Sequence, residues 1–154
     1  MFKILIADKV DKSVIDQIKN SNFTFNYQPE ITPQDLIKTI SNYEGLIVRS
    51  RTKVTVDVID RGHNLKVIAR VGSGLDNIDC NEAKKRKITV INSPDSNSES
   101  VMELTLGLII SLLRKLSSSY LSMSQGLWLK RDFKGQELGG KKVGIIGFGH
   151  VGKN

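Results

Sequence analysis

The sequence has few of the residues that mark disulfide-stapled, metal-binding or membrane proteins. It contains a single cysteine, Cys80, which excludes an intramolecular disulfide and fits a reducing compartment. Its two histidines, His63 and His150, give Cys80 no metal-ligand spacing, so we expect no metal site. The most apolar stretch, residues 101–113, contains Glu103 and is shorter than the ~20 residues that a membrane-spanning helix needs. We therefore expect a soluble, cytoplasmic protein.

The net charge of +7 raises the question of a nucleic-acid partner, with residues 84–87 as the densest basic run. No aromatic side chains alternate with this run as stacking platforms for bases. Cations in the last turn of a short helix also favour the negative end of its dipole, which explains the run without any ligand. We therefore expect no nucleic-acid partner. A basic surface also suits a small anionic substrate and an anionic cofactor.

Strand and helix patterns alternate along the first part of the chain. Helical signals include Thr32 as an N-cap before Pro33, a short helix from Thr55, and the capping pair Asp79 and Glu82. Strands are expected at residues 2–7, 45–49, 66–71 and 88–92, which are largely apolar, and at residues 23–27, which alternate as a half-exposed strand. This alternation predicts an α/β fold with a flavodoxin-like, doubly wound parallel sheet and helices on both faces.

The pattern changes after a break at residues 93–97. One long helix is expected at residues 98–125, apolar over more than one face, and it therefore needs a large surface to cover it. A last strand is expected at residues 142–146. We place the boundary between two domains in the break, with residues 1–95 before it and residues 96–154 after it. We expect the isolated chain to aggregate or to pair through the long helix.

A dinucleotide fingerprint, Gly147-x-Gly149-x-x-Gly152, follows the expected last strand. Gly147 allows a tight turn, Gly149 lets the backbone approach a pyrophosphate, and Gly152 lets the next helix pack closely. Free N–H groups at the start of that helix would hold the diphosphate. The acidic residue that separates NAD from NADP is expected about 20 positions further on, beyond residue 154. We expect NAD, with NADP as one alternative and a glycine-rich turn without a ligand as the other.

Two further elements indicate an anionic ligand. Gly72, Ser73 and Gly74 leave the carboxyl end of an expected strand, where open α/β sheets bind ligands. Glycines on both sides of a serine allow consecutive amides to point at one carboxylate or phosphate. Arg49 and Ser50 end another strand and could bind an anionic substrate through a guanidinium and a hydroxyl group. A surface salt bridge is the alternative role for Arg49.

Taken together, these motifs resemble the D-isomer-specific 2-hydroxyacid dehydrogenases, in one collinear order over the whole chain. The segments that carry the resemblance are Ile47-Val48-Arg49-Ser50-x-Thr52-Lys53-Val54-Thr55, Arg70-x-Gly72-x-Gly74-x-Asp76-Asn77-Ile78-Asp79, Asn92-Ser93-Pro94-x-x-Asn97 and the glycine fingerprint. The resemblance implies that residues 1–95 form a substrate-binding domain. Residues 96–154 would then be the truncated start of a Rossmann NAD-binding domain. They would include an arm at residues 98–128 that forms a homodimer or homotetramer.

The resemblance also implies an activity, the NAD-dependent oxidation of a D-2-hydroxy acid to a 2-keto acid. The nearest likeness is to members that convert 3-phosphoglycerate to 3-phosphohydroxypyruvate, the first step of serine biosynthesis. Oxidation of glycerate or lactate, and a non-catalytic partner-binding or regulatory module of the same ancestry, are the alternatives. The positions matching the substrate site are Arg49, Ser50, Gly72, Ser73, Gly74 and Asn97. Those matching the cofactor site are Ser73, Gly147, Gly149, His150, Val151 and Gly152.

Two positions depart from the family pattern. His150 stands where an arginine is common, so a permanent charge on the diphosphate is replaced by a titratable one. Asp95 stands where a glycine is common, which would stiffen the interdomain hinge. The family's catalytic arginine, acid and histidine match no residue here and are expected beyond residue 154. His63 follows Gly62 at a helix end, where a solvated or capping role is expected. The 154 residues alone are therefore expected to be inactive.

Overall fold

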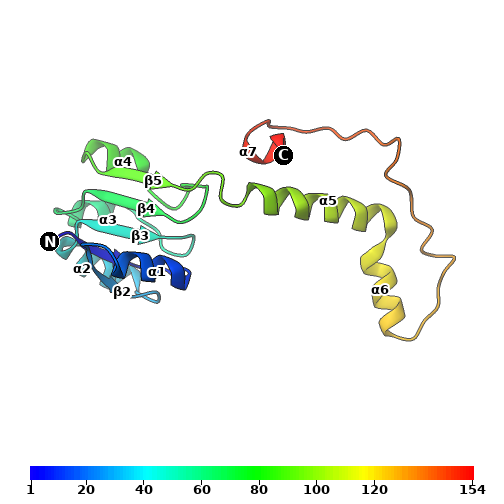
Figure 1. Ribbon diagram of the computed structural model, residues 1–154, viewed down its shortest axis with the longest axis horizontal. Helices are drawn as coiled ribbons and strands as arrows, with labels where there is room; N and C mark the ends of the chain where they lie inside the picture. Colours follow the sequence, from blue (N-terminus) through cyan, green and yellow to red (C-terminus); the bar gives the residue numbers. More distant parts are fainter. The chain divides into compact units, whose positions relative to one another are not determined.

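The computed structural model describes all 154 residues and divides the chain into two compact units, Met1–Ser96 and Asn97–Asn154. The first unit is built on a parallel five-stranded sheet in the order β2-β1-β3-β4-β5 (Figure 1). This is the order of flavodoxin-like doubly wound folds, so the predicted α/β sheet is confirmed. Its strands are β1 (Lys3–Ile6), β2 (Thr24–Tyr27), β3 (Gly45–Val48), β4 (Val67–Arg70) and β5 (Thr89–Asn92).

Helices of the first unit begin at the expected caps. The Thr32 hydroxyl accepts the Asp35 N–H at 3.1 Å, and the Asp79 carboxylate accepts the Glu82 N–H at 2.9 Å. Both side chains thereby satisfy an N–H that has no partner within the helix. The helices are α1 (Lys12–Lys19), α2 (Pro33–Thr39), α3 (Val56–Arg61) and α4 (Cys80–Lys85), with a 3₁₀ turn η1 (Ile40–Asn42) after α2.

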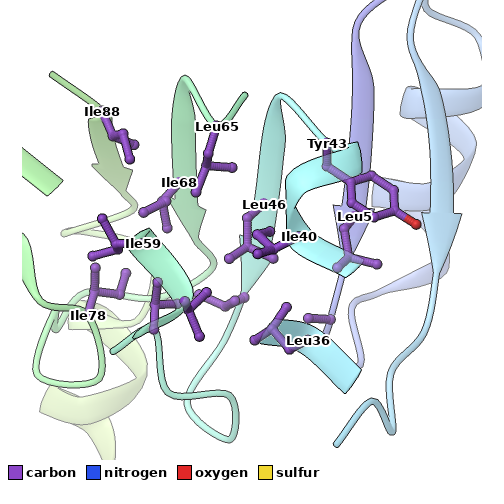
Figure 2. Packing of buried hydrophobic residues seen from close by; sticks show 14 of the residues in the cluster. Leu5, Leu36, Ile40, Tyr43, Leu46, Ile59, Leu65, Ile68, Ile78 and Ile88 are labelled. Atoms are coloured by element: carbon purple, nitrogen blue, oxygen red, sulfur yellow. The ribbon is translucent and has the colours of Figure 1, made fainter. Parts of the chain in front are cut away.

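The main core of the first unit lies on one face of the sheet. Leu5, Leu46 and Ile68, from three adjacent strands, have no exposed surface, and side chains of α2, α3 and α4 pack against them (Figure 2). Figure 1 shows α1 in front of the strands, with α2 and α3 behind. The front face is buried at Ile6 of β1 but left open at Ile91 of β5, which is 51% exposed. The helices therefore cover one face well and the other only in part.

The basic run at the end of α4 is engaged by acidic neighbours. Lys85 Nζ lies 2.8 Å from Glu82 Oε2, and Arg86 Nη2 lies 2.5 Å from Asp60 Oδ1. The hydrogen bond from Lys85 lowers the pKa of the Glu82 carboxyl group and raises that of Lys85 itself. These pairs are solvent-exposed, and such pairs contribute little to stability. They nevertheless show that two of the four basic side chains at residues 84–87 bind acidic neighbours within the protein.

The second unit corrects the prediction of one long helix at residues 98–125. The chain forms α5 (Ser98–Arg114) and α6 (Leu116–Ser124), separated by Lys115 in the left-handed conformation, with φ 53° and ψ 38°. The Lys115 N–H bonds back to the Leu112 carbonyl oxygen at 3.3 Å, which ends α5. Its ammonium group donates to the Asp132 carbonyl oxygen at 3.1 Å. The apolar periodicity continues through this break, which is why the sequence pattern did not reveal it.

The left-handed conformation of Lys115 predicts how substitutions at this position change the stability of the protein. A side chain with a Cβ costs roughly 1–2 kcal/mol in this conformation and glycine does not. We therefore expect Lys115→Gly to be more stable than Lys115→Ala by about 1 kcal/mol. At Ser118, inside α6, the order should reverse, with Ser118→Ala more stable than Ser118→Gly by about 1 kcal/mol. Urea unfolding followed by helical circular dichroism measures both pairs. The same order at both positions would contradict the break at Lys115.

The strand predicted at residues 142–146 is also wrong, because these residues form no strand. A strand needs a neighbour to receive its backbone hydrogen bonds, and the second unit contains no other strand. Val143, Ile145 and Ile146 are accordingly exposed. The last element, α7 (His150–Lys153), is a single short turn of helix.

Helix α5 exposes much of its apolar surface. Leu104, Leu108 and Leu112 are 62%, 61% and 80% exposed. None of the helices has both the length and the hydropathy that crossing a bilayer requires.

Candidate functional site

The two predicted anion-binding turns of the first unit lie at the same edge of the sheet. Strands β3 and β4 are adjacent and parallel, and Val48 pairs with Arg70 in their register. Arg49 and Ser50 directly follow β3, and the loop at residues 72–74 follows β4 two residues after its end. The carboxyl edge of an open α/β sheet is where such folds bind ligands. The structure therefore brings these five predicted substrate-site residues to one edge.

The Arg49 guanidinium is available to a ligand at this edge. The residue is exposed, and its Nη1 donates only to the Lys9 carbonyl oxygen at 3.3 Å. No carboxylate lies within ion-pair distance of it, so the surface salt bridge considered for Arg49 is not formed. The adjoining Ser50 is exposed as well. A positive charge and a hydroxyl group are thus presented side by side.

Arg49 lines two hollows. One, of about 310 Å³, is lined by Asp8, Lys9, Pro29, Glu30, Arg49, Ser50 and Arg51. The other, of about 450 Å³, is lined by Lys9, Val10, Asp11, Val14, Arg49 and Val71. Both are within the size range of small-molecule sites. In the first hollow Lys9 is paired with Glu30 at 3.1 Å, which leaves Arg49 as its unpaired cation.

The loop after β4 has free amides and occupied carbonyls. The N–H groups of Gly72, Ser73 and Gly74 donate to no acceptor within the protein. The Gly72 carbonyl oxygen accepts the Ser93 N–H at 3.1 Å, and the Ser73 carbonyl oxygen accepts Asn92 Nδ2 at 2.6 Å. Unpaired successive amides are the donor set that anion-binding nests provide. The loop is therefore fixed through its acceptors, and its donors are left for a ligand.

Gly72 is required by the backbone of this loop. Its φ is +142°, which side chains with a Cβ rarely adopt, and an added Cβ would lie 2.6 Å from Arg70 Nη1. The Arg70 guanidinium thus packs directly against the loop, and its Nε has no hydrogen-bond partner. A second cation therefore lies next to the free amides.

Two residues of this edge, Asp8 and Arg51, were not identified from the sequence. Asp8 is buried and accepts hydrogen bonds from the turn that carries Arg49. Arg51 Nε lies 3.0 Å from the Asp8 carboxylate. The available signal was an acid directly after a buried strand that leads to the carboxyl edge. Asn77, which was noted only as part of a motif, donates to two carbonyl oxygens of the same turn.

The glycine turn of the second unit has the geometry that the fingerprint requires. Gly147 has φ +93°, and a Cβ at Gly152 would collide with the Gly147 carbonyl oxygen. Gly149 precedes α7, and His150 and Val151 form its first turn. Two of the three fingerprint positions, Gly147 and Gly152, thus require glycine in this backbone. Such a turn fits a close approach of the backbone to a diphosphate. The roles of these residues in cofactor binding remain predictions.

Asn97 and His63, the other residues considered from the sequence, make few contacts in the structure. Asn97 is exposed at the start of α5, and its side chain makes no capping hydrogen bond. His63 is exposed after α3, as expected for a solvated residue, and its N–H bonds the Arg61 carbonyl oxygen at 2.9 Å. No three His, Cys, Asp or Glu side chains are grouped so as to hold a metal ion.

Comparison with known proteins yields a family match over nearly the whole chain. Residues 4–147 match the catalytic domain of the D-isomer specific 2-hydroxyacid dehydrogenases. A hydroxypyruvate reductase of Thermotoga maritima is 40% identical over 152 residues, which are 99% of this chain and 50% of that protein. A D-3-phosphoglycerate dehydrogenase of Homo sapiens is 39% identical over 151 residues, which are 98% of this chain and 28% of that protein.

A solved structure shares the fold. The NAD⁺-bound 3-phosphoglycerate dehydrogenase of Entamoeba histolytica superimposes with a TM-score of 0.77 at 30% identity, covering 99% of this chain and 48% of that one. This chain thus spans about half, or less, of the length of these relatives.

Proposed function

Because the chain belongs to the D-isomer specific 2-hydroxyacid dehydrogenase family, we propose that it serves an enzyme that oxidises a D-2-hydroxy acid to a 2-keto acid with NAD. Residues 1–95 would bind the substrate and residues 96–154 would begin the NAD-binding domain. The observation that carries the proposal is that the free amides of Gly72, Ser73 and Gly74 lie at the same sheet edge as Arg49, whose guanidinium has no ion pair. Both offer hydrogen-bond donors to a carboxylate or a phosphate.

The substrate we propose is D-3-phosphoglycerate, whose oxidation to 3-phosphohydroxypyruvate begins serine biosynthesis. It carries two anionic groups, and the carboxyl edge offers separate donor sets in the 72–74 loop and in Arg49 with Ser50. The D-3-phosphoglycerate dehydrogenases among the relatives support this choice. D-Glycerate is the second candidate, because a hydroxypyruvate reductase is equally similar to this chain.

The cofactor proposal rests on the glycine turn. Gly147, Gly149, His150, Val151 and Gly152 would hold the diphosphate, and Ser73 is proposed as a further cofactor-binding residue. Bound NAD would accept the hydride from the C2 atom of the substrate while the hydroxyl group loses its proton. This chain's part is to bind and orient the two anions. The base that takes the proton, with its acid partner and the carboxylate-orienting arginine, is proposed to lie outside these 154 residues.

Assembly and location are part of the same proposal. The exposed leucines of α5 form an apolar surface of the kind that is unusual on a soluble monomer. We propose that the 98–128 segment pairs with another copy, giving a homodimer or homotetramer. The enzyme would act in the cytoplasm, on small molecules and without a nucleic-acid partner.

A spectrophotometric assay tests the proposed activity. With the whole protein that contains this chain, we expect NADH to form from D-3-phosphoglycerate with kcat/KM at least about tenfold above that for D-glycerate or D-lactate. Residues 1–154 alone should form none, because the proposed base is absent. Turnover by residues 1–154 would place the base within this chain. A whole protein inactive on all three acids would favour a non-catalytic module.

A further inference from the structure

Asp8 is the one charged residue that is buried in the structure, with 2% of its surface exposed. It follows β1 directly, and β1 lies beside β3 in the sheet, so Asp8 reaches the carboxyl edge next to the turn of Arg49. A buried carboxylate is unfavourable unless hydrogen bonds and an opposite charge compensate for the lost water. The burial of Asp8 therefore depends on the groups that bond its carboxylate.

Every partner of the Asp8 carboxylate comes from the turn at residues 49–52. Oδ2 accepts the backbone N–H of Arg49 at 2.6 Å and that of Thr52 at 3.2 Å. Oδ1 accepts the Thr52 hydroxyl at 2.7 Å and pairs with Arg51 Nε at 3.0 Å. One side chain thus bonds both ends of the turn, and charge-assisted bonds of this kind are the stronger ones.

Asn77 bonds the same turn as a hydrogen-bond donor, whereas Asp8 bonds it as an acceptor. Its Nδ2 donates to the carbonyl oxygens of Arg49 at 2.8 Å and of Thr52 at 2.7 Å. The N–H and C=O groups of both residues are therefore bonded, by Asp8 and by Asn77 respectively. The backbone of the turn is fixed at both ends, and the Arg49 and Ser50 side chains remain exposed.

We propose that Asp8 is a positioning residue, which holds residues 49–52 in the shape that presents Arg49 and Ser50 to the substrate anion. The proposal rests on the proposed function, in which Arg49 binds substrate. Asp8 acts on the substrate anion through the backbone of Arg49, whose N–H its carboxylate accepts. A neutral side chain at residue 8 would loosen the turn without removing either ligand group.

The test uses Asp8→Asn, which keeps the shape and replaces one acceptor oxygen by a donor. We expect amide hydrogen exchange at Arg49 and Thr52 to become at least about tenfold faster. In the whole protein we expect KM for D-3-phosphoglycerate to rise about tenfold, with kcat and KM for NAD changed by less than about twofold. Asp16→Asn, which alters an exposed acid of α1, is the matched control and should change none of these values.

A double-mutant cycle separates positioning from general loosening of the fold. In an Arg49→Met background, Asp8→Asn should raise KM by less than about twofold, because its effect is transmitted through Arg49. Should Asp8→Asn fail to fold, Thr52→Val removes one bond to the carboxylate and should raise KM about threefold and speed exchange at Thr52.

Three results overturn the inference. They are unchanged exchange at Arg49 and Thr52 in a folded variant, an unchanged KM in an active one, and a tenfold effect that persists without Arg49. Failure of the proposed function has a different signature, the absence of turnover in the unmodified whole protein. The exchange measurement needs no substrate and still decides whether Asp8 orders the turn.

Discussion

Replacing Arg49 by methionine should raise KM for D-3-phosphoglycerate about 30-fold in the whole enzyme. Hydrogen bonds to charged groups contribute about 1.5–3 kcal/mol, and the loss of one such contact corresponds to a change of this size. The guanidinium has no ion-pair partner within the protein, so its removal should leave the fold intact. KM for NAD should stay within about twofold, because the proposed cofactor turn lies in the other unit.

The matched control is Arg61→Met at the end of α3, another exposed arginine without an ion pair. It should leave both KM values unchanged. Comparing substrates identifies the anionic group that Arg49 contacts. If it contacts the phosphate, Arg49→Met should raise KM for D-glycerate, which has no phosphate, much less than KM for D-3-phosphoglycerate. If Arg49→Met and Arg61→Met behaved alike, Arg49 would have no place in the substrate site.

A single methyl group at residue 152 should weaken NAD binding about 100-fold. In Gly152→Ala the new Cβ would collide with the Gly147 carbonyl oxygen, so the turn must open. Forcing an extra methyl group into a closely packed position costs about 1–3 kcal/mol, the upper end of which matches this loss. Calorimetric titration of the whole protein with NAD measures the change in Kd.

Gly139→Ala is the control for this substitution. A Cβ at Gly139 meets no atom within 4 Å, and its backbone is not in the left-handed region. NAD affinity should therefore be unaffected. Wild-type affinity in Gly152→Ala would show that the 147–152 turn does not hold the cofactor, and the nucleotide part of the proposal would then fail.

The fold of the first unit could be predicted because its signals are local. Four short apolar runs and one alternating segment predicted the five strands, and capping residues such as Thr32 and Asp79 predicted helix starts. The placement of Arg49 and of the 72–74 loop at one edge then follows, because all strands are parallel. Parallel strands share the edge at which they end.

The errors arose where a tertiary partner or a single dihedral angle decides the outcome. Residues 142–146 have the composition of a strand but no neighbour with which to pair. The break at Lys115 depends on one residue entering a conformation that is rare for lysine. The position of Asp8 after a buried strand is visible in the sequence, but its partners are not, since they lie 41 to 44 residues away.

The loop after β4 has a chemical consequence for ligand choice. Because the Gly72 and Ser73 oxygens are already engaged by Ser93 and Asn92, the loop offers hydrogens and few lone pairs to an arriving molecule. The ammonium group of a ligand is itself a hydrogen-bond donor, so the N–H groups of this loop could not bond it. The positive charge of Arg70, which packs against the loop, would also repel it. In the proposed site, this loop would therefore favour the hydroxy acid over its amino counterpart, whose ammonium group finds no acceptor there.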